Sequence, residues 1–139
     1  MERKVFAWIV RHLHWLARVP GLPHFFDAAL FAWTMCRRPQ RRVAMETLEE
    51  TILRSWPCRL GTHHLGGSAY RLHGREIAHL HGNGLLDVRL DRANAATFVA
   101  AGLAEPHHLL GHSVWVSYWL ESSDDIGGAL TLIRAAAAS

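Results

Sequence analysis

The sequence has few cysteines and no long apolar run, and each lack argues against a class of protein. Its two cysteines, Cys36 and Cys58, form no CxxC motif, so a disulfide framework is disfavoured and free thiols are expected. No segment reaches the roughly 18–20 apolar residues that a membrane-spanning helix needs. The apolar stretch from Val5 to Val10 is shorter than the core of a signal peptide. We therefore expect a cytoplasmic protein.

Acidic residues are rare in the first third of the chain. Residues 1–42 contain eight Lys and Arg against only Glu2 and Asp27, a formal charge of +6, whereas residues 43–139 contain seven basic and ten acidic residues, a charge of −3. This distribution weakens the case for a core that binds nucleic acid. It leaves open a non-catalytic interaction module, which would bind nucleic acid, a membrane surface or a protein partner through the basic third.

Three helices are expected in the N-terminal section. The first, over residues 2–18, carries apolar side chains every three or four positions, and the segment Pro20-Gly21-Leu22-Pro23 ends it. A second is expected over residues 24–36. A third follows Pro39, because proline suits the first turn of a helix.

The stretch from His63 to Leu90 has the alternation of an antiparallel meander, with turns at Gly74 and at Gly82-Asn83-Gly84. Sorting the residues by even and odd sequence position separates an apolar face of the predicted sheet from a polar one. The apolar face comprises Tyr70, Leu72, Ala78, Leu80, Leu86, Val88 and Leu90. The polar face comprises Arg71, His73, Arg75, Ile77, His79, His81, Asp87 and Arg89.

The remaining pattern completes an α+β fold. A fourth strand is expected at residues 114–120, and helices follow the N-caps Asp91 and Ser122 or Ser123, with Gly102 just past the end of the first of these helices. We predict a basic helical section at residues 1–55, followed at residues 56–139 by a four-stranded antiparallel sheet backed by two helices. A chain of 139 residues is expected to form one cooperative domain.

The polar face carries side chains that bind metals and transfer protons in other proteins. His79 and His81 lie two apart and so share a face, Asp87 lies on the next strand, and His107 or His108 could reach them from a loop. His79, His81 and Asp87 are candidate ligands for a divalent metal. These three residues, together with His107 and His108, could instead perform acid–base catalysis without a metal. The alternative without any site is an ordinary solvated sheet face.

Other residues could bind a substrate. Arg71, His73 and Arg75 are candidates for holding an anionic group, and Trp115 could form the wall of a pocket or pack beneath the N-terminal helices. We expect the N-terminal helices to cover the polar face and enclose a pocket there, or to form a homodimer.

Two motifs are distinctive: GREIAHLHGNGLLD at residues 74–87, and EPHH with SVWVS between residues 105 and 117. They resemble the luciferase-domain family of bacteria and fungi from about Trp56 onward. With the upstream pieces VPGLP and RRPQRRVAMETLEETIL, the resemblance covers most of the chain. It implies a small α+β fold in a largely uncharacterised family, and the family name does not by itself imply light emission. A flavin-dependent reaction of the (β/α)₈-barrel kind is disfavoured, because that barrel needs about 250 residues.

Together these features favour a small-molecule-binding protein with a pocket lined by histidine and arginine. His79, His81, Asp87, His107 and His108 would carry any chemistry, and whether the protein is an enzyme stays open at this point. The interaction module is the alternative. Nucleic acid and membrane surfaces are the less favoured partners.

Overall fold

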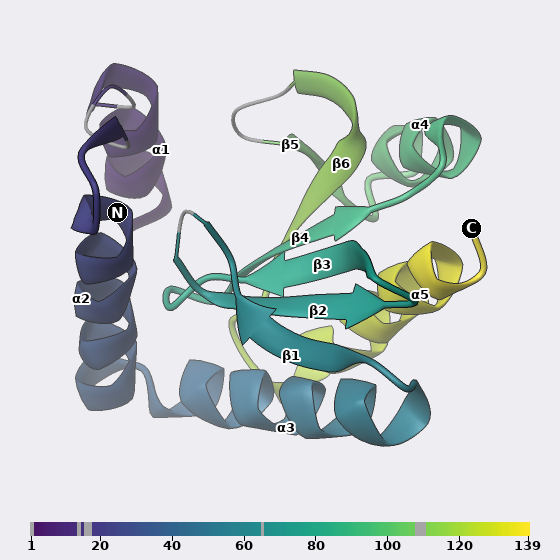
Figure 1. Cartoon of the computed structure of the whole chain (residues 1–139), viewed down its shortest axis with the longest axis horizontal. Helices are drawn as coiled ribbons and strands as arrows, with labels where there is room; N and C mark the ends of the chain where they lie inside the picture. Colours follow the sequence, from purple (N-terminus) through teal and green to yellow (C-terminus); the bar gives the residue numbers. More distant parts are fainter. Residues whose placement is uncertain (1, 14, 16–17, 65, 108–110) are drawn as a thin grey trace.

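The computed structural model describes residues 2–13, 15, 18–64, 66–107 and 111–139, and within them it contains five α-helices and one six-stranded sheet (Figure 1). The predicted α+β class is therefore confirmed. In chain order the elements are α1 (Glu2–Leu13), α2 (Leu22–Arg37), α3 (Pro39–Ser55), β1 (Arg59–Thr62), β2 (Ser68–Leu72), β3 (Arg75–Leu80), β4 (Leu85–Arg89), α4 (Arg92–Ala100), β5 (Glu105–His107), β6 (Gly111–Trp119), a 3₁₀ turn (Ser123–Asp125) and α5 (Ile126–Ala137).

The helix ends follow the expected capping chemistry. Pro39 begins α3, and the side chain of Asp91 accepts a hydrogen bond from the backbone N–H of Asn94 at 2.8 Å. Gly102, with a left-handed φ of 69°, follows the C-cap of α4. The first helix is shorter than the predicted range of residues 2–18, because α1 ends at Leu13.

The sheet has the strand order β1-β2-β3-β4-β6-β5, and each neighbouring pair is antiparallel. The predicted number of four strands is wrong, since the two edge strands β1 and β5 are added. Most side chains of β1 are exposed, so it lacks the alternation of a half-buried strand. The β5 strand contains Pro106, whose missing N–H is tolerated at a sheet edge. Sequence patterns detect such edge strands poorly.

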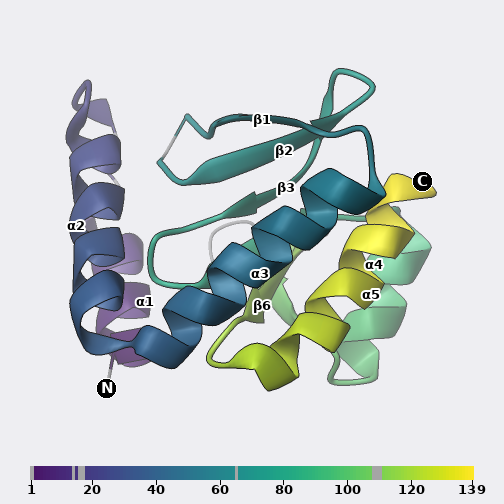
Figure 2. The same ribbon diagram turned by 90° about the horizontal axis from the view of Figure 1, so that it is seen from below.

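One face of the sheet packs against α3 and α5, which lie side by side across it (Figure 2). All seven residues of the predicted apolar face are buried in this core. The α3 helix contributes the fully buried Leu48 and Ile52, and α5 contributes Leu132 and Ile133. Each such side chain stabilises the fold by about 2 kcal/mol through burial. The α3 helix therefore shares a core with the strands, although it belongs to the N-terminal section.

A β-bulge interrupts the pairing of β2 with β3. Arg71 lies opposite Glu76 and the adjacent Tyr70 lies opposite Ala78, so Ile77 is an extra residue on β3. A bulge changes which face the residues on either side of it point to. Regular alternation therefore fails at this point of the strand.

The bulge corrects the predicted polar face. Ile77 is 1% exposed and belongs to the core, and Arg75 donates hydrogen bonds to carbonyls at the end of α5, those of Ala136 and Ser139. Glu76 instead shares a face with His79. The prediction that Arg75 and Ile77 accompany His79 on the polar face is therefore wrong, because it assumed an uninterrupted period of two.

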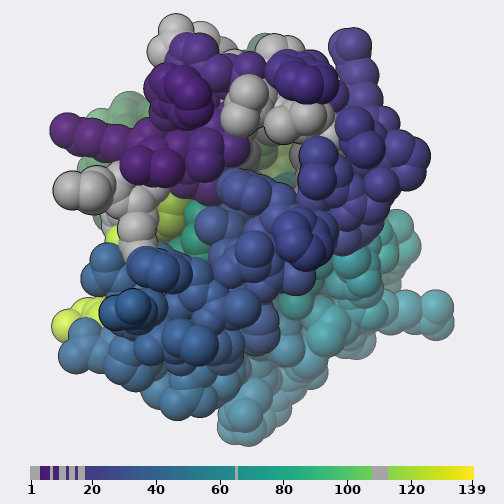
Figure 3. Space-filling model, turned by 90° about the vertical axis from the view of Figure 1, so that its left-hand side faces the viewer, coloured from purple at the N-terminus to yellow at the C-terminus, as the bar shows by residue number. Residues whose placement is uncertain are grey.

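The helices α1 and α2 lie at the end of the sheet where the β3–β4 turn is found (Figure 1), and they make up much of the face seen in Figure 3. Side chains of both reach the polar face of the sheet. The ring of Phe6 lies 6.4 Å from the ring of His81, and Oδ1 of Asp27 lies 3.6 Å from Nδ1 of His81. Among the described helices, none combines the length and apolar character that crossing a membrane requires.

Tyr70 makes the stability of this core sensitive to alkaline pH. Burial and the carboxylate of Glu49, which accepts its hydroxyl hydrogen bond at 3.0 Å, raise the pKa of Tyr70 well above its usual value of about 10. The free energy of unfolding should therefore fall as the pH rises above about 10, because Tyr70 loses its hydroxyl proton at a lower pH in the unfolded chain than in the folded protein. We expect Tyr70→Phe to flatten the decline in the free energy of unfolding above about pH 10, measured by urea denaturation. An equally steep decline in the variant would contradict this assignment.

Candidate functional site

A cluster of buried histidines and carboxylates lies on the polar face of the sheet. His79 is near the end of β3, His81 follows that strand, Asp87 is in the middle of β4, and His107 ends β5. Asp87 is 0% exposed, and the three histidines are each less than a tenth exposed. Buried ionised groups are costly unless they are paired. The cluster must therefore balance its own charges.

Asp87 is the centre of this cluster. Its Oδ2 lies 3.2 Å from Nε2 of His79, 3.3 Å from Nε2 of His81 and 3.6 Å from Nε2 of His107. Its Oδ1 accepts a hydrogen bond from the hydroxyl of Ser117. Strand pairing explains the arrangement, because Asp87 sits opposite His79 on β3 and opposite Ser117 on β6.

Glu76 holds the other side of His79. Its Oε1 lies 3.0 Å from Nδ1 of His79 and 3.4 Å from Nε2 of His63, and its Oε2 accepts a hydrogen bond from Arg71 at 3.3 Å. The rings of His63 and His79 are stacked with their centroids 3.8 Å apart. His79 is therefore placed between two carboxylates, with one ring nitrogen facing each.

The two histidines beside His79 have opposite charge states. Burial opposes a charge on His81, but Asp27 and Asp87 outweigh it and raise the pKa of His81 to about 9. His81 is therefore an imidazolium at neutral pH and balances buried negative charge. Burial and the neighbouring His79 lower the pKa of His63 to about 3, so His63 is neutral.

Four of the predicted site residues lie together, namely His79, His81, Asp87 and His107. Trp115 is beside them, with its ring centroid 5.1 Å from that of His79 and 6.4 Å from that of His107. His108 lies outside the described residues. The polar face of the meander is thus the place where the structure gathers these side chains.

The predicted anion-binding residues are placed differently. Arg71 borders the cluster, where its guanidinium binds Glu76. His73 is exposed in the β2–β3 turn with a left-handed φ of 51°, and Arg75 lies against the end of α5. Arg75 is four residues from His79 along β3, roughly 13 Å. His73 and Arg75 therefore lie at the opposite end of the hairpin from the cluster.

Three members of the cluster were not among the predicted site residues. Regular alternation assigns Glu76 to the face opposite His79, and the bulge brings the two residues to the same face. His63 lies between β1 and β2, at the start of the predicted meander and before the first residue that was assigned to a face. Asp27 is the single acidic residue within the predicted helix over residues 24–36, and that isolation was the available signal.

Two groups of three residues bring possible ligand atoms within 4.8 Å of one another. One comprises His79, Asp87 and His107, all buried, and the other comprises His63, Glu76 and His79. Both use His79, through different ring nitrogens. Imidazole nitrogens and carboxylate oxygens are suitable donors for zinc or iron(II).

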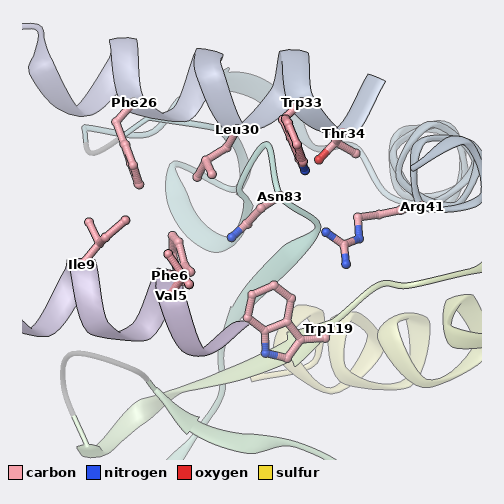
Figure 4. Close-up of a pocket in the computed structure, with 10 residues that line it drawn as sticks. All are labelled: Val5, Phe6, Ile9, Phe26, Leu30, Trp33, Thr34, Arg41, Asn83 and Trp119. Carbon is pink, nitrogen blue, oxygen red and sulfur yellow. The ribbon is translucent and has the colours of Figure 1, made fainter. Parts of the chain in front are cut away.

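A pocket of about 350 Å³ adjoins the cluster, within the size range of small-molecule sites (Figure 4). The α1 and α2 helices provide most of its walls. Phe6 connects the pocket with the cluster, since its ring lies 6.1 Å from that of Trp119, which lines the pocket, and 6.4 Å from that of His81.

Comparison with known proteins supports the resemblance seen in the motifs. Residues 74–136 match the family model described as Luciferase domain. No curated protein and no solved structure matches the chain. The matched residues run from the β2–β3 turn into α5 and include His79, His81, Asp87 and His107, whereas α1, α2 and α3 lie outside them. The comparison thus shows that residues 74–136, and with them the centre of the histidine cluster, are similar to the luciferase-domain family.

Proposed function

We propose that this protein binds a divalent metal ion through His79, Asp87 and His107 and uses the site to bind a small molecule. The observation that carries the proposal is the convergence of three imidazole nitrogens on one buried carboxylate oxygen, Oδ2 of Asp87.

Hydrogen bonding alone accounts poorly for this convergence. A carboxylate oxygen has two lone pairs, and the charged His81 is placed to donate to one of them. The nitrogens of His79 and His107 then approach the same oxygen at 3.2 and 3.6 Å. These distances are at or beyond the long end of the usual N–H···O range of about 2.7–3.2 Å.

The distances do suit ligands of a common metal. Two ligand atoms that each lie about 2.1 Å from a zinc ion at the tetrahedral angle are about 3.4 Å apart. The separations of Asp87 Oδ2 from His79 and His107 bracket that value. Three protein donors also leave coordination positions for water or a small molecule.

The surroundings prepare His79 to act as a ligand. Glu76 lies 3.0 Å from Nδ1 of His79, so a proton on Nδ1 leaves the lone pair of Nε2 directed toward Asp87. Metal-binding histidines commonly have such a carboxylate partner, which sets the tautomer and the ring orientation. Ser117 orients Asp87 in the same way, through Oδ1.

His81 has a different role in this proposal. It belongs to neither group of possible ligands, and in the metal-free site Asp27 and Asp87 raise its pKa to about 9, so it balances buried negative charge there. A bound metal ion would polarise a carbonyl group or activate a water molecule at the open position. Trp115, beside His79 and His107, would limit access of bulk water.

Metal counting tests the site. Metal-depleted protein is dialysed against Zn²⁺ or Fe²⁺ and analysed by mass spectrometry of the elements. We expect one ion per chain in the wild type and at least about tenfold weaker affinity in His79→Ala and His107→Ala. The control is His73→Asn, because His73 is exposed, distant from the cluster and in a backbone conformation that asparagine tolerates.

Equal metal affinity in His79→Ala and the wild type would contradict this assignment. A wild type that binds no metal under these conditions would also overturn it. The second result would favour the metal-free alternative, in which His79 and Asp87 form an acid–base pair within the same small-molecule site.

A further inference from the structure

The pocket beside the histidine cluster has an almost entirely apolar surface, and two buried polar side chains lie at one end of it (Figure 4). Phe26 and Ile9 lie at one end of this view, and Thr34 and Arg41 lie at the other. Thr34 and Arg41 flank the corner where α2 is followed by α3, so the chain itself brings them to the same end. The remaining lining residues are Asn83, which is polar, and the largely apolar Val5, Phe6, Leu30, Trp33 and Trp119.

Thr34 has an unsatisfied hydroxyl in this pocket. Its residue is 0% exposed, and its Oγ1 has no hydrogen-bond partner among the described residues. A buried hydroxyl without a partner typically costs about 1–3 kcal/mol. An apolar side chain of the same shape would avoid that cost, so the hydroxyl points to a bound group that completes its hydrogen bonding.

Arg41 brings a positive charge to the same end. Its residue is only 4% exposed, and its stem lies against Gly84, where an added Cβ would be 2.8 Å from Cδ of Arg41. Its guanidinium also donates a hydrogen bond to Glu121, a half-exposed residue. A guanidinium has five N–H donors in a planar fork, which suits a second carboxylate as well as the first.

We propose that the pocket binds an apolar monocarboxylate, of which a medium-chain fatty acid is the simplest example. The carboxylate would bind Arg41 and the hydroxyl of Thr34, and the chain would lie between α1 and α2 toward Ile9 and Phe26. Such a ligand matches both ends of the pocket, one charged and hydrogen-bonding, the other apolar. The binding of this ligand to the pocket is independent of the proposed function. Only the idea that it is also the small molecule of the metal site rests on that proposed function.

Titration of the full-length, metal-depleted protein with decanoate tests the proposal. Binding is followed by calorimetry and by tryptophan fluorescence, because Trp33 and Trp119 line the pocket. We expect saturable binding at one site, and at least tenfold weaker binding of decanol, which has the same chain without the charge. Arg41→Met and Thr34→Val should each weaken decanoate binding by about tenfold.

Thr34→Val separates a binding role from a structural one. Valine has nearly the shape of threonine and removes the unsatisfied hydroxyl, so this variant should unfold at the same or a higher urea concentration while it loses affinity. Decanoate binding that is absent in the wild type, or unchanged in Thr34→Val and Arg41→Met, would overturn the proposal. Decanol binding as tight as decanoate binding would do the same.

The metal site and the pocket are tested independently. His79→Ala should lose metal and keep its affinity for decanoate, because His79 does not line the pocket. Thr34→Val should keep its metal and lose affinity for decanoate. A Thr34→Val variant that loses metal together with decanoate affinity would contradict a ligand site centred on Thr34 and Arg41.

Discussion

Asp87→Ala should abolish metal binding and destabilise the protein by about 3 kcal/mol, since removing one partner of a buried ionic group leaves the others uncompensated. Asp87 is fully buried, and three histidines and Ser117 are arranged around its two oxygens. Alanine removes the acceptor of the Ser117 hydrogen bond and leaves the charged His81 with Asp27 but without Asp87. The free energy of unfolding is measured in urea with chelator present, so that the loss of metal does not contribute.

Asp87→Asn is the matched variant for this prediction. Asparagine keeps the size of the side chain, and its carbonyl oxygen can still accept the Ser117 hydrogen bond. The destabilisation should therefore be smaller than for alanine. Metal affinity should still fall at least about tenfold, because the amide lacks the negative charge of the ligand. Stoichiometric metal in Asp87→Asn at wild-type affinity would count against Asp87 as a metal ligand.

Gly82→Ala should separate α2 from the sheet and remove decanoate binding. A Cβ at position 82 would lie 2.6 Å from the carbonyl oxygen of Asp27 and 2.6 Å from the backbone nitrogen of Phe31. Both atoms belong to the backbone of α2, so relief requires the helix to move. The backbone N–H of Gly82, which donates to Oδ1 of Asp27 at 2.8 Å, would then lose its partner.

The expected cost of Gly82→Ala is about 1–3 kcal/mol, the range for overpacking at a close contact. The control is Gly127→Ala in α5, where an added Cβ meets no atom within 4 Å and φ is not left-handed. That change should be neutral or slightly stabilising, since alanine favours helix. Urea unfolding gives the stability and fluorescence titration gives the affinity. Gly82→Ala with wild-type values of both would contradict the close packing of the turn on α2.

Much of the site follows from local patterns in the sequence. Side chains of a strand alternate between faces by covalent geometry, so Leu86 and Val88 could be assigned to the core and Asp87 to the opposite face. The turn at Gly82-Asn83-Gly84 then sets β3 beside β4, which brings His79 opposite Asp87. These relations involve residues close in the chain, and they need no knowledge of the remaining fold.

Other parts of the site depend on contacts between distant segments. Because of the bulge at Ile77, Glu76 rather than Arg75 lies on the same face as His79. The pattern of a single strand does not reveal the bulge, because the register depends on how two strands pair. His107 reaches Asp87 only because β5 adds to the edge of β6. Asp27 reaches His81 only because α2 packs on the turn at Gly82.

Alternation and capping could therefore be read from the amino-acid order, since each is decided within a few neighbouring residues. The pairing of an edge strand, the position of a bulge and the docking of a helix are decided by the free energy of the whole packed chain. The histidine cluster combines both kinds of information. Its centre, His79 with Asp87, is local, whereas Glu76 is turned toward His79 by the bulge, and Asp27 and His107 come from distant segments of the chain.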